Sequence, residues 1–391
     1  MKAAINAHST TRTPLAVLLS AAAVSAGLLF VRGIGSPATE QARPAAPALA
    51  MDTQSQINRL QAQMKTGVGR ANDFAQLGWL MLQRARENGD PDLYSRAEKA
   101  FAEALQRDPA QDDALLGQGS LALSRHSFAD AIVWGRKALA HNPYRAQAYG
   151  VIGDGQLELG RYDEAAQTIQ KMVDLRPDIA SYSRVSYLRE LNGDMPGAID
   201  AMSRAVVAGN PGSEARAWAQ VQLGLLHFDR GDLTSAETEI NGVLSYLPNY
   251  PHALAVLARI RNAQGNPTAA IQLYERAINL LPMPEHAQAL GEIYTHLGQV
   301  GQARAQFDLA RTLYTLGESG GTDVTLERAR FESEHGDAAL ALTLARSAQQ
   351  RRANIHSADA LAWALHRNGQ NNEAAAVMRD ALRLNTQDAM L

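Results

Sequence analysis

The sequence predicts an all-α protein, built as a solenoid of antiparallel helix pairs. One small residue, alanine, returns at intervals of 33 to 38 residues between positions 97 and 374. Between these alanines the apolar residues follow a spacing near 3.6, which is typical of amphipathic helices. A period near 34 residues that continues through most of a chain is typical of stacked repeats. The recurring residues are Ala97, Ala131, Ala165, Ala198, Ala236, Ala270, Ala303, Ala341 and Ala374.

Two further landmarks divide each unit into its two helices. A small residue twelve positions before the alanine, as at Gly153 and Gly291, lets the two helices approach closely, because a large side chain would hold their backbones apart. A glycine five positions before the alanine is expected to take the left-handed conformation that ends the first helix. These glycines are Gly160, Gly193, Gly231, Gly265, Gly298, Gly336 and Gly369.

A proline often marks the end of the second helix, because proline cannot continue a helix. We therefore expect each unit to hold two helices of about a dozen residues, and the units to stack because one unit cannot bury its apolar face alone. These prolines stand twelve positions after the alanine: Pro109, Pro143, Pro177, Pro248 and Pro282.

The pattern resembles the tetratricopeptide repeat (TPR) family. The clearest copies are residues 149–177, 254–282 and 287–310, and about nine units in register cover residues 71–388. The resemblance implies a right-handed superhelix of helix pairs, with a concave groove that is lined by the first helix of each unit.

Three departures from the repeat are visible in the sequence. The first unit has an insertion at residues 87–94, and two other units are lengthened near residues 208–217 and 315–323. The eighth unit is degenerate and has Arg328 where a leucine is usual. The inserted loops are either tolerated on the surface or act as recognition elements.

The N-terminal residues 1–31 resemble a signal peptide or a signal anchor. Lys2 and Arg12 precede an uncharged apolar stretch at 15–31, which is the order expected of an export signal. Small residues before a cut after Ala26 favour cleavage, whereas the apolar residues that continue past the cut favour an uncleaved anchor. Both alternatives predict that the repeats are exported, because the leading positive charge stays inside. A buried helix of a cytosolic protein is a third alternative, but nothing nearby could cover it.

An Ala/Pro-rich linker is expected at residues 32–51 and an amphipathic capping helix at 52–70. Ile57, Leu60 and Met64 share one face of that helix, which either caps the first repeat or serves self-association. The solenoid then fills residues 71–391. The sequence stops soon after the ninth unit, without a helix to cover the last apolar face. Either that unit frays, or another chain covers it, or the sequence is truncated.

Composition excludes several classes of function. The chain has 391 residues, no cysteine and a formal net charge of −3. Disulfides, thiolate metal sites and a thiol nucleophile are therefore excluded. A nucleic-acid-binding array should be markedly basic, so this balance argues against nucleic acid as a partner.

No motif predicts a catalytic residue, a metal site or a cofactor. The glycine-rich residues 153–160 resemble a phosphate loop, but these glycines are repeat landmarks within a helix and no strand precedes them. His356 and His366 stand near Asp359 on one helix, and their ten-residue separation does not place them on one turn. We therefore expect neither an enzyme nor a metalloprotein.

The groove supplies the candidate site, although a solvated face without a ligand is the alternative. Tyrosine and arginine are enriched at binding hot spots, and Tyr187 and Arg259 are expected to face solvent in the free protein. The lysine and asparagine set with which some members of the family hold chaperone carboxylates is not present on the first helices. The candidate partner-binding residues are Asp154, Arg184, Tyr187, Glu190, Arg259, Asn262 and Glu292.

These observations predict a non-catalytic scaffold or adaptor that binds a protein or peptide partner in its groove. We expect it to be extracytoplasmic, in the periplasm, and attached to the membrane through residues 1–31 if these are not cleaved. One alternative is an accessory subunit that delivers substrates to a separate envelope enzyme. Another is a structural protein that self-associates through its C-terminal end.

Location provides a first test. With the apolar stretch at 15–31 intact, the protein should fractionate with membranes or with the exported compartment, and without that stretch it should remain in the cytosol. A reporter fused after Leu391 should be active outside the cytosol. Activity of that reporter in the cytosol alone would contradict export.

Overall fold

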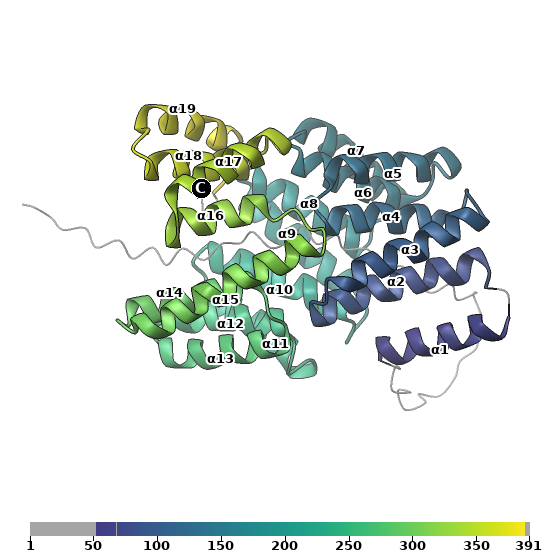
Figure 1. Ribbon diagram of the computed structural model, residues 1–391, viewed down its shortest axis with the longest axis horizontal. Coiled ribbons are helices and arrows are strands. Elements are labelled where there is room, and N and C mark those ends of the chain that lie inside the picture. The colour runs from purple at the N-terminus through teal and green to yellow at the C-terminus, as the bar shows by residue number, and fades with distance from the viewer. Residues whose placement is uncertain (1–51, 68, 388–391) are drawn as a thin grey trace, which may run out of the picture.

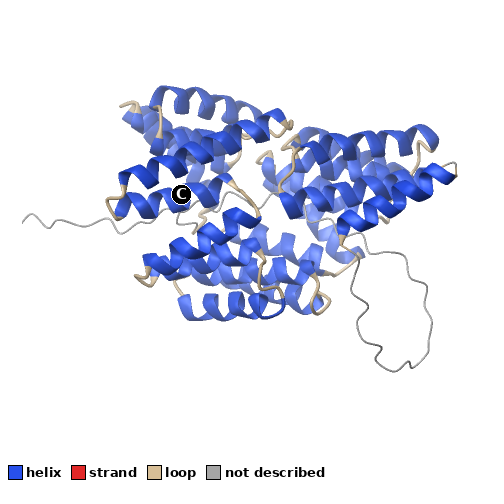
Figure 2. Cartoon of the chain, turned by 60° about the horizontal axis from the view of Figure 1, so that its bottom comes forward, coloured by secondary structure: helices blue, strands red, loops and turns tan. Residues whose placement is uncertain are grey.

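The computed structural model describes residues 52–67 and 69–387 (Figure 1). The predicted signal at 1–31 and linker at 32–51 lie outside the described residues. Every regular element in the described part of the chain is helical, with nineteen α-helices and one short 3₁₀ helix, so the predicted all-α class is confirmed (Figure 2).

One helix precedes the repeats, and nine antiparallel helix pairs follow it in the described residues. The first helix is α1 (Thr53–Thr66) and the 3₁₀ helix at the other end is η1 (Leu382–Leu384). Units 1 to 9 are the pairs α2 (Ala71–Asn88) and α3 (Asp92–Arg107), α4 (Asp112–Ser124) and α5 (Phe128–His141), α6 (Ala146–Glu158) and α7 (Tyr162–Leu175), α8 (Ile179–Leu191) and α9 (Met195–Ala208), α10 (Glu214–Asp229) and α11 (Leu233–Tyr246), α12 (Pro251–Ala263) and α13 (Pro267–Leu280), α14 (Pro284–His296) and α15 (Val300–Ser319), α16 (Thr325–His335) and α17 (Ala338–Arg351), and α18 (Ile355–Arg367) and α19 (Asn371–Ala381).

Helix α1 covers the outer face of unit 1. Asp52 caps its start, because its carboxylate accepts a hydrogen bond from the Ser55 backbone N–H at 3.1 Å. Ile57 and Leu60 are buried in the same apolar cluster as residues of α2 and α3. The Thr53 hydroxyl also donates to the Glu87 carboxylate near the end of α2, at 2.5 Å.

The recurring alanines and small residues lie where the two helices of a unit meet. All nine alanines are buried, with at most 8% of their surface exposed. A Cβ atom added to Gly153 would lie 2.9 Å from Ile169, and one added to Gly291 would lie 2.6 Å from Phe307. Both partner side chains belong to the second helix of the same unit. The predicted reason for these small residues, a close approach of the two helices, is therefore confirmed.

Turn and cap residues set the boundaries of the helices. The glycine between the two helices is left-handed in units 3 to 7 and in unit 9, with φ between +71° and +83°. Many second helices begin at a residue whose side chain caps the first turn. In α9, for example, the Asp194 carboxylate accepts a hydrogen bond from the Gly197 N–H at 3.0 Å. The five predicted prolines each stand two residues beyond the last residue of a second helix.

The prediction for the turn glycine is wrong in unit 8. Gly336 has φ −142° and ψ −137°, which is not the left-handed region. The Glu332 carboxylate lies against this turn, and a Cβ atom at this position would make that flexible side chain move. In unit 2 the equivalent residue is not a glycine at all, and His126 itself takes a left-handed φ of 58°.

First helices lie on the concave side of the stack. The first helices of neighbouring units pack directly against one another through most of the array, whereas second helices mainly contact their own partner and the first helix that follows. The junctions of units 6 and 7 and of units 7 and 8 are exceptions, because α12 with α14 and α14 with α16 make few direct contacts. Between units 7 and 8, α15 meets α16 through large aromatic side chains. Phe331 packs there against Phe307 and Tyr314, with ring centroids 6.1 and 5.7 Å apart.

Successive turns of the superhelix come into contact after about five units. Figure 1 shows the yellow-green end of the chain, α16 to α19, beside the blue helices of units 2 and 3. His126 in the turn of unit 2 donates from Nδ1 to the carbonyl of Asp323, which follows unit 7, at 2.8 Å. Asn354 after unit 8 donates to the carbonyl of Glu158 at the turn of unit 3, at 2.9 Å. Thr386 after unit 9 donates to the carbonyl of Glu190 near the turn of unit 4, at 3.3 Å.

These contacts form a regular line that we call the seam. Its paired residues are 197, 196 and 196 positions apart, so each contact advances by one unit on both sides. A Cβ atom on Gly160 would lie 2.3 Å from the carbonyl oxygen of Ala353, and one on Gly193 would lie 2.3 Å from that of Asn385. The equivalent Gly265 has open space around it. The seam thus adds a requirement for glycine in units 3 and 4 that the repeat alone does not impose.

Replacing Gly160 with alanine should weaken the fold more than the same change at Gly265. Both variants put alanine in the left-handed region, at a cost of about 1–2 kcal/mol. Gly160→Ala also drives Cβ into the backbone of Ala353, so we expect at least about 2 kcal/mol of further loss in the free energy of unfolding. Urea unfolding measures both variants. Hydrogen exchange at the Ile355 amide, which donates across the seam to the Tyr162 hydroxyl at 2.9 Å, reports the seam itself. Equal losses in the two variants would contradict the seam.

Candidate partner-binding groove

All seven predicted groove residues lie on first helices, in α6, α8, α12 and α14. Asp154 is on α6, and Arg184, Tyr187 and Glu190 are on α8. The other residues are Arg259 and Asn262 on α12 and Glu292 on α14.

Asp154 and Arg184 form a bidentate ion pair between units 3 and 4. The Arg184 Nε and Nη2 atoms donate to the two carboxylate oxygens of Asp154 at 2.8 and 2.7 Å, and Nη1 donates to the carbonyl of Ala180 at 2.9 Å. Arg184 is buried, with 6% of its surface exposed. Burial raises the pKa of Asp154 against the opposing effect of the guanidinium. The pair joins two units and leaves little of the arginine for a ligand.

Gly150 makes room for this ion pair. A Cβ atom at that position would lie 3.1 Å from the guanidinium of Arg184, which is a tight contact. The absence of a side chain at Gly150 therefore lets Arg184 pack against α6.

Arg259 also makes contacts between units. Its guanidinium lies over the ring of Phe228, 4.7 Å from the centroid, and 3.8 Å from the carboxylate of Asp229. Only 13% of its side-chain surface is exposed. The expectation that Arg259 faces solvent is wrong, because α10 supplies both an aromatic face and a carboxylate for it. Asn262 follows on the same helix and is half-buried.

Tyr187 reaches across the seam instead of facing an open groove. Its hydroxyl lies 3.4 Å from Nε2 of His356 on α18, 169 residues away in the sequence. Burial, together with the positive charges of Arg330 and Arg352, lowers the pKa of His356 to about 3, so its imidazole is neutral at ordinary pH. Tyr187 is half-buried, and the prediction that it faces solvent is therefore only partly right.

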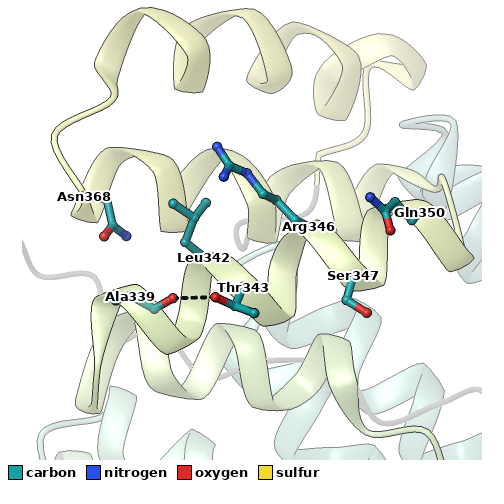
Figure 3. Close-up of a pocket in the computed structure, with 7 residues that line it drawn as sticks. All are labelled: Ala339, Leu342, Thr343, Arg346, Ser347, Gln350 and Asn368. Carbon is teal, nitrogen blue, oxygen red and sulfur yellow. Dashed lines mark hydrogen bonds between the residues drawn. The ribbon is translucent and has the colours of Figure 1, made fainter.

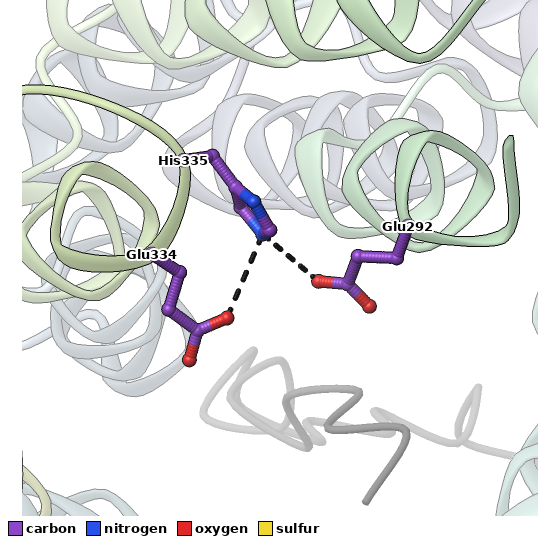
Figure 4. A group of neighbouring side chains, drawn as sticks. All are labelled: Glu292, Glu334 and His335. Carbon is purple, nitrogen blue, oxygen red and sulfur yellow. Dashed lines mark hydrogen bonds and ion pairs between the residues drawn. The ribbon is translucent and has the colours of Figure 1, made fainter. Parts of the chain in front are cut away.

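Glu292 lies at the junction of units 7 and 8 and is buried, with 8% of its surface exposed. His335 on α16 places Nε2 3.0 Å from one of its oxygens, and Gln288 donates to the same oxygen at 3.0 Å. Figure 4 shows His335 between the carboxylates of Glu292 and Glu334.

The concave face is thus lined by pairs of charged or polar groups that join neighbouring units. Each pair places one charged group on one unit and its partner on the next unit, so the polarity of the groove contributes to the stacking. The pairs of this kind are Asp113 with Arg145, Asp154 with Arg184, Asp229 with Arg259, Glu292 with His335, and Arg330 with Asp359.

A second group of charges, which the sequence did not reveal, lies at the seam. Arg352 is buried and donates from Nη2 to both oxygens of Glu327, at 2.9 and 3.1 Å. Its Nη1 lies 4.0 Å from a Glu158 carboxylate oxygen, and its guanidinium faces the ring of Phe128 at 5.5 Å. Arg352 therefore bridges unit 8 and units 2 and 3.

The two carboxylates around Arg352 titrate in opposite directions. Burial raises the pKa of Glu158 to about 7, and Arg352 offsets this only in part while Glu327 and Asp154 add to it. Burial also acts to raise the pKa of Glu327, but Arg352 and His126 outweigh it and hold that pKa below its usual value. Because Arg352 neutralises Glu327, Glu158 is the carboxylate that favours its protonated form.

Trp363 is an exposed aromatic residue on the first helix of unit 9. It keeps 39% of its surface exposed and stacks on His366, with ring centroids 5.2 Å apart. It lies seven residues after His356 on α18, so both side chains are on the same face of the helix. The contact of Tyr187 with His356 and the exposed ring of Trp363 therefore belong to one continuous surface, about 10 Å apart along the helix axis.

Comparison with known proteins agrees with the repeat geometry. The tetratricopeptide repeat family matches residues 82–149, 151–214 and 221–283. The chain belongs to the tetratricopeptide repeat family. The matched segments cover units 1 to 6, and the structure adds units 7 to 9 to the same stack.

Curated relatives are similar over part of this TPR protein. Cellulose synthase 1 operon protein C of Komagataeibacter xylinus is 27% identical over 225 residues, which is 58% of this chain and 15% of the relative. Cellulose synthase operon protein C of Xanthomonas axonopodis pv. citri is 28% identical over 235 residues, 59% of this chain and 14% of the relative. The matched region thus spans about one seventh of these relatives.

Solved TPR structures share the fold at low sequence identity. A human IFIT1 dimer with m7Gppp-AAAA has a TM-score of 0.54 and 15% identity, and the match covers 85% of this chain and 77% of IFIT1. The Cut9-Hcn1 hetero-tetramer of APC/C has a TM-score of 0.50 and 16% identity, over 80% of this chain and 60% of that chain.

The convex side of this TPR protein carries a shallow groove of about 400 Å³ along α17 (Figure 3). Arg346 is the one charged residue in its lining, and the guanidinium lies 3.8 Å from Glu373. This lining holds no pair of groups suited to acid–base or nucleophilic chemistry. In residues 52–67 and 69–387, none of the helices has the length and apolar character needed to span a membrane.

The seam should make the stability of this protein depend on pH through Glu158. Because the folded-state pKa of about 7 lies above the ordinary 4.5, protonation favours the fold. The contribution of Glu158 protonation to the free energy of unfolding is fully present below pH 4.5 and is lost as pH rises through 7. It amounts to at most about 3 kcal/mol.

Glu158→Gln should therefore flatten the change in melting temperature between pH 4.5 and 7, relative to the unmodified protein. Asp130→Asn, at an exposed position, serves as the control and should leave that change as it is. Parallel pH profiles for the unmodified protein and Glu158→Gln would show that Glu158 does not titrate in this range.

Proposed function

We propose that this TPR protein is a non-catalytic scaffold that binds a partner polypeptide on its concave face outside the cytosol. The observation that carries the proposal is Trp363, a large aromatic residue on a first helix that stays substantially exposed. Tryptophan is enriched at binding hot spots because it offers a large contact area together with a polar N–H group.

The proposed contact surface runs from α8 to α18. Tyr187, Glu190 and Asn262 are half-buried and keep part of their side chains accessible, so they remain candidate contacts. Four other predicted residues support this surface without lying open on it, because their pairs set the spacing of the first helices: Asp154, Arg184, Arg259 and Glu292.

The charge pattern favours a protein partner of mixed charge. Positive and negative groups alternate along the first helices, and the chain as a whole has a net charge of −3. The IFIT1 structures hold capped or triphosphate RNA, and such a ligand calls for an excess of positive charge. This chain offers no such excess overall, so we propose a polypeptide and not RNA.

Export supports a partner in the cell envelope. The order of charge and apolar residues at 1–31 is that of an export signal. Whether the segment is cleaved decides between a tethered and a soluble scaffold in the periplasm.

A second candidate function is an accessory subunit of an envelope enzyme. The relatives take their name from the cellulose synthase operon, and they share the repeat region with this chain. We propose this role as the alternative, with the separate enzyme supplying the catalysis. A deletion strain that makes normal amounts of exported polysaccharide would count against a role beside a polysaccharide synthase.

The groove proposal predicts a large effect of two aromatic residues. Tyr187→Ala combined with Trp363→Ala should weaken binding to a partner recovered by pull-down by more than about 2 kcal/mol, or about 30-fold, if both are hot spots. Calorimetry or surface plasmon resonance measures the affinity, and circular dichroism confirms that the helices are retained.

Tyr144→Ala is the matched control, because Tyr144 is 79% exposed in the loop between α5 and α6. It should bind the partner as the unmodified protein does. If the double variant binds the partner with unchanged affinity, the partner uses another face and the site assignment is withdrawn. A pull-down that recovers only the protein itself favours the self-associating alternative.

A further inference from the structure

Three side chains with metal-ligand chemistry meet where unit 7 joins unit 8. They are Glu292 on α14 and Glu334 and His335 at the end of α16, and one ligand atom of each lies within 4.8 Å of the other two (Figure 4). Nε2 of His335 is 3.0 Å from Oε1 of Glu292 and 3.5 Å from Oε2 of Glu334. Glu292 and His335 are 43 residues apart, so stacking of the units assembles this group.

The two carboxylates of this group differ in their surroundings from Asp154 and Glu327. Asp154 faces Arg184, and Glu327 faces Arg352, so each has a full positive charge beside it. Among the residues that the structure describes, Glu292 and Glu334 have an ion-pair contact with His335 and with no arginine or lysine.

Two carboxylates thus share one imidazole, which leaves an excess of negative charge even when His335 is protonated. Arg330 lies nearby, but its guanidinium pairs with Asp359 at 3.2 Å. A bound cation would neutralise this excess, because a metal ion is the largest charge in such a site.

The neighbouring side chains hold the ligand atoms in place. The ring of His335 stacks on Phe307, with centroids 4.3 Å apart and planes at 16°, and this contact directs Nε2 toward the carboxylates. Gln288 donates to the same oxygen, Oε1 of Glu292, at 3.0 Å and helps to fix that carboxylate. Such supporting contacts are what orient the ligands of metal sites.

The first helices at this junction, like those of units 6 and 7, make few direct contacts with each other. First helices of neighbouring units pack closely through most of the array, but α14 and α16 approach each other little. Here the rings of Phe307 and Tyr314 on α15 pack against the ring of Phe331 on α16. The ligand side chains therefore have to span two helices that are not in close contact.

We propose that Glu292, Glu334 and His335 bind a divalent transition-metal ion that joins unit 7 to unit 8. Two carboxylate oxygens and one imidazole nitrogen suit zinc, and they also suit manganese or iron(II). The ion takes the place of a proton at His335 Nε2, and that proton is released to solvent. Three protein ligands leave room for water or for a side chain of a partner in the groove. The proposal does not depend on the identity of that partner.

Zinc titration of the full chain tests this proposal. The protein is purified in mild detergent and freed of metal with a chelator, and zinc and manganese chlorides are titrated separately by calorimetry. We expect one ion per chain and a rise in melting temperature on binding. His335→Gln and Glu334→Gln should each lower the affinity at least about tenfold.

The control is His366→Gln, which removes an exposed histidine on α18 and should leave zinc affinity unchanged. His335 packs on Phe307, so His335→Gln is first checked for folding by circular dichroism. Glu334→Gln removes a partly exposed carboxylate and keeps the test decisive if His335→Gln does not fold. Absence of binding by either metal, or equal binding by the unmodified protein and Glu334→Gln, would overturn the proposal.

Discussion

The contact between successive turns of the superhelix is the constraint on which the rest of this structure depends. An ordinary solenoid is held by neighbouring units alone. Here units 2 to 4 also contact the chain that follows units 7 to 9, through hydrogen bonds between residues some 196 positions apart. The buried Arg352 with Glu327 and Glu158 lies on this line of contact, and so does Tyr187. The seam therefore decides which parts of the concave face are open and which are covered.

The repeat made much of the fold predictable. Local requirements recur in every unit, so the alanine at the helix contact, the turn glycine and the terminal proline could be read without any knowledge of tertiary structure. Gly336 departs from the pattern because its backbone is not left-handed, and the Glu332 carboxylate lies where a Cβ atom would be. His126 replaces the glycine of unit 2, and its ring is used in a contact with Asp323 that no local pattern could indicate.

The candidate site was less predictable than the fold. Periodicity placed Arg259 and Tyr187 on first helices, but the residues that cover them depend on how units stack and on how turns meet. Arg259 finds Phe228 and Asp229 on the preceding first helix, and Tyr187 finds His356 across the seam. The same limit hid the contact between Glu292, a predicted groove residue, and His335, because spacing rules for metal ligands apply within one helix or loop and not between units.

The constant register of the seam bears on how such an array can gain or lose repeats. In a solenoid with contacts between neighbours alone, a duplicated unit lengthens the stack and leaves the other interfaces as they were. In this chain a unit added between units 4 and 7 would move every later loop one position along the opposite turn. Ala353 would then no longer face Gly160, and Arg352 would lose the environment that neutralises it. Changes in repeat number are therefore tolerated at the ends of the array and opposed within it.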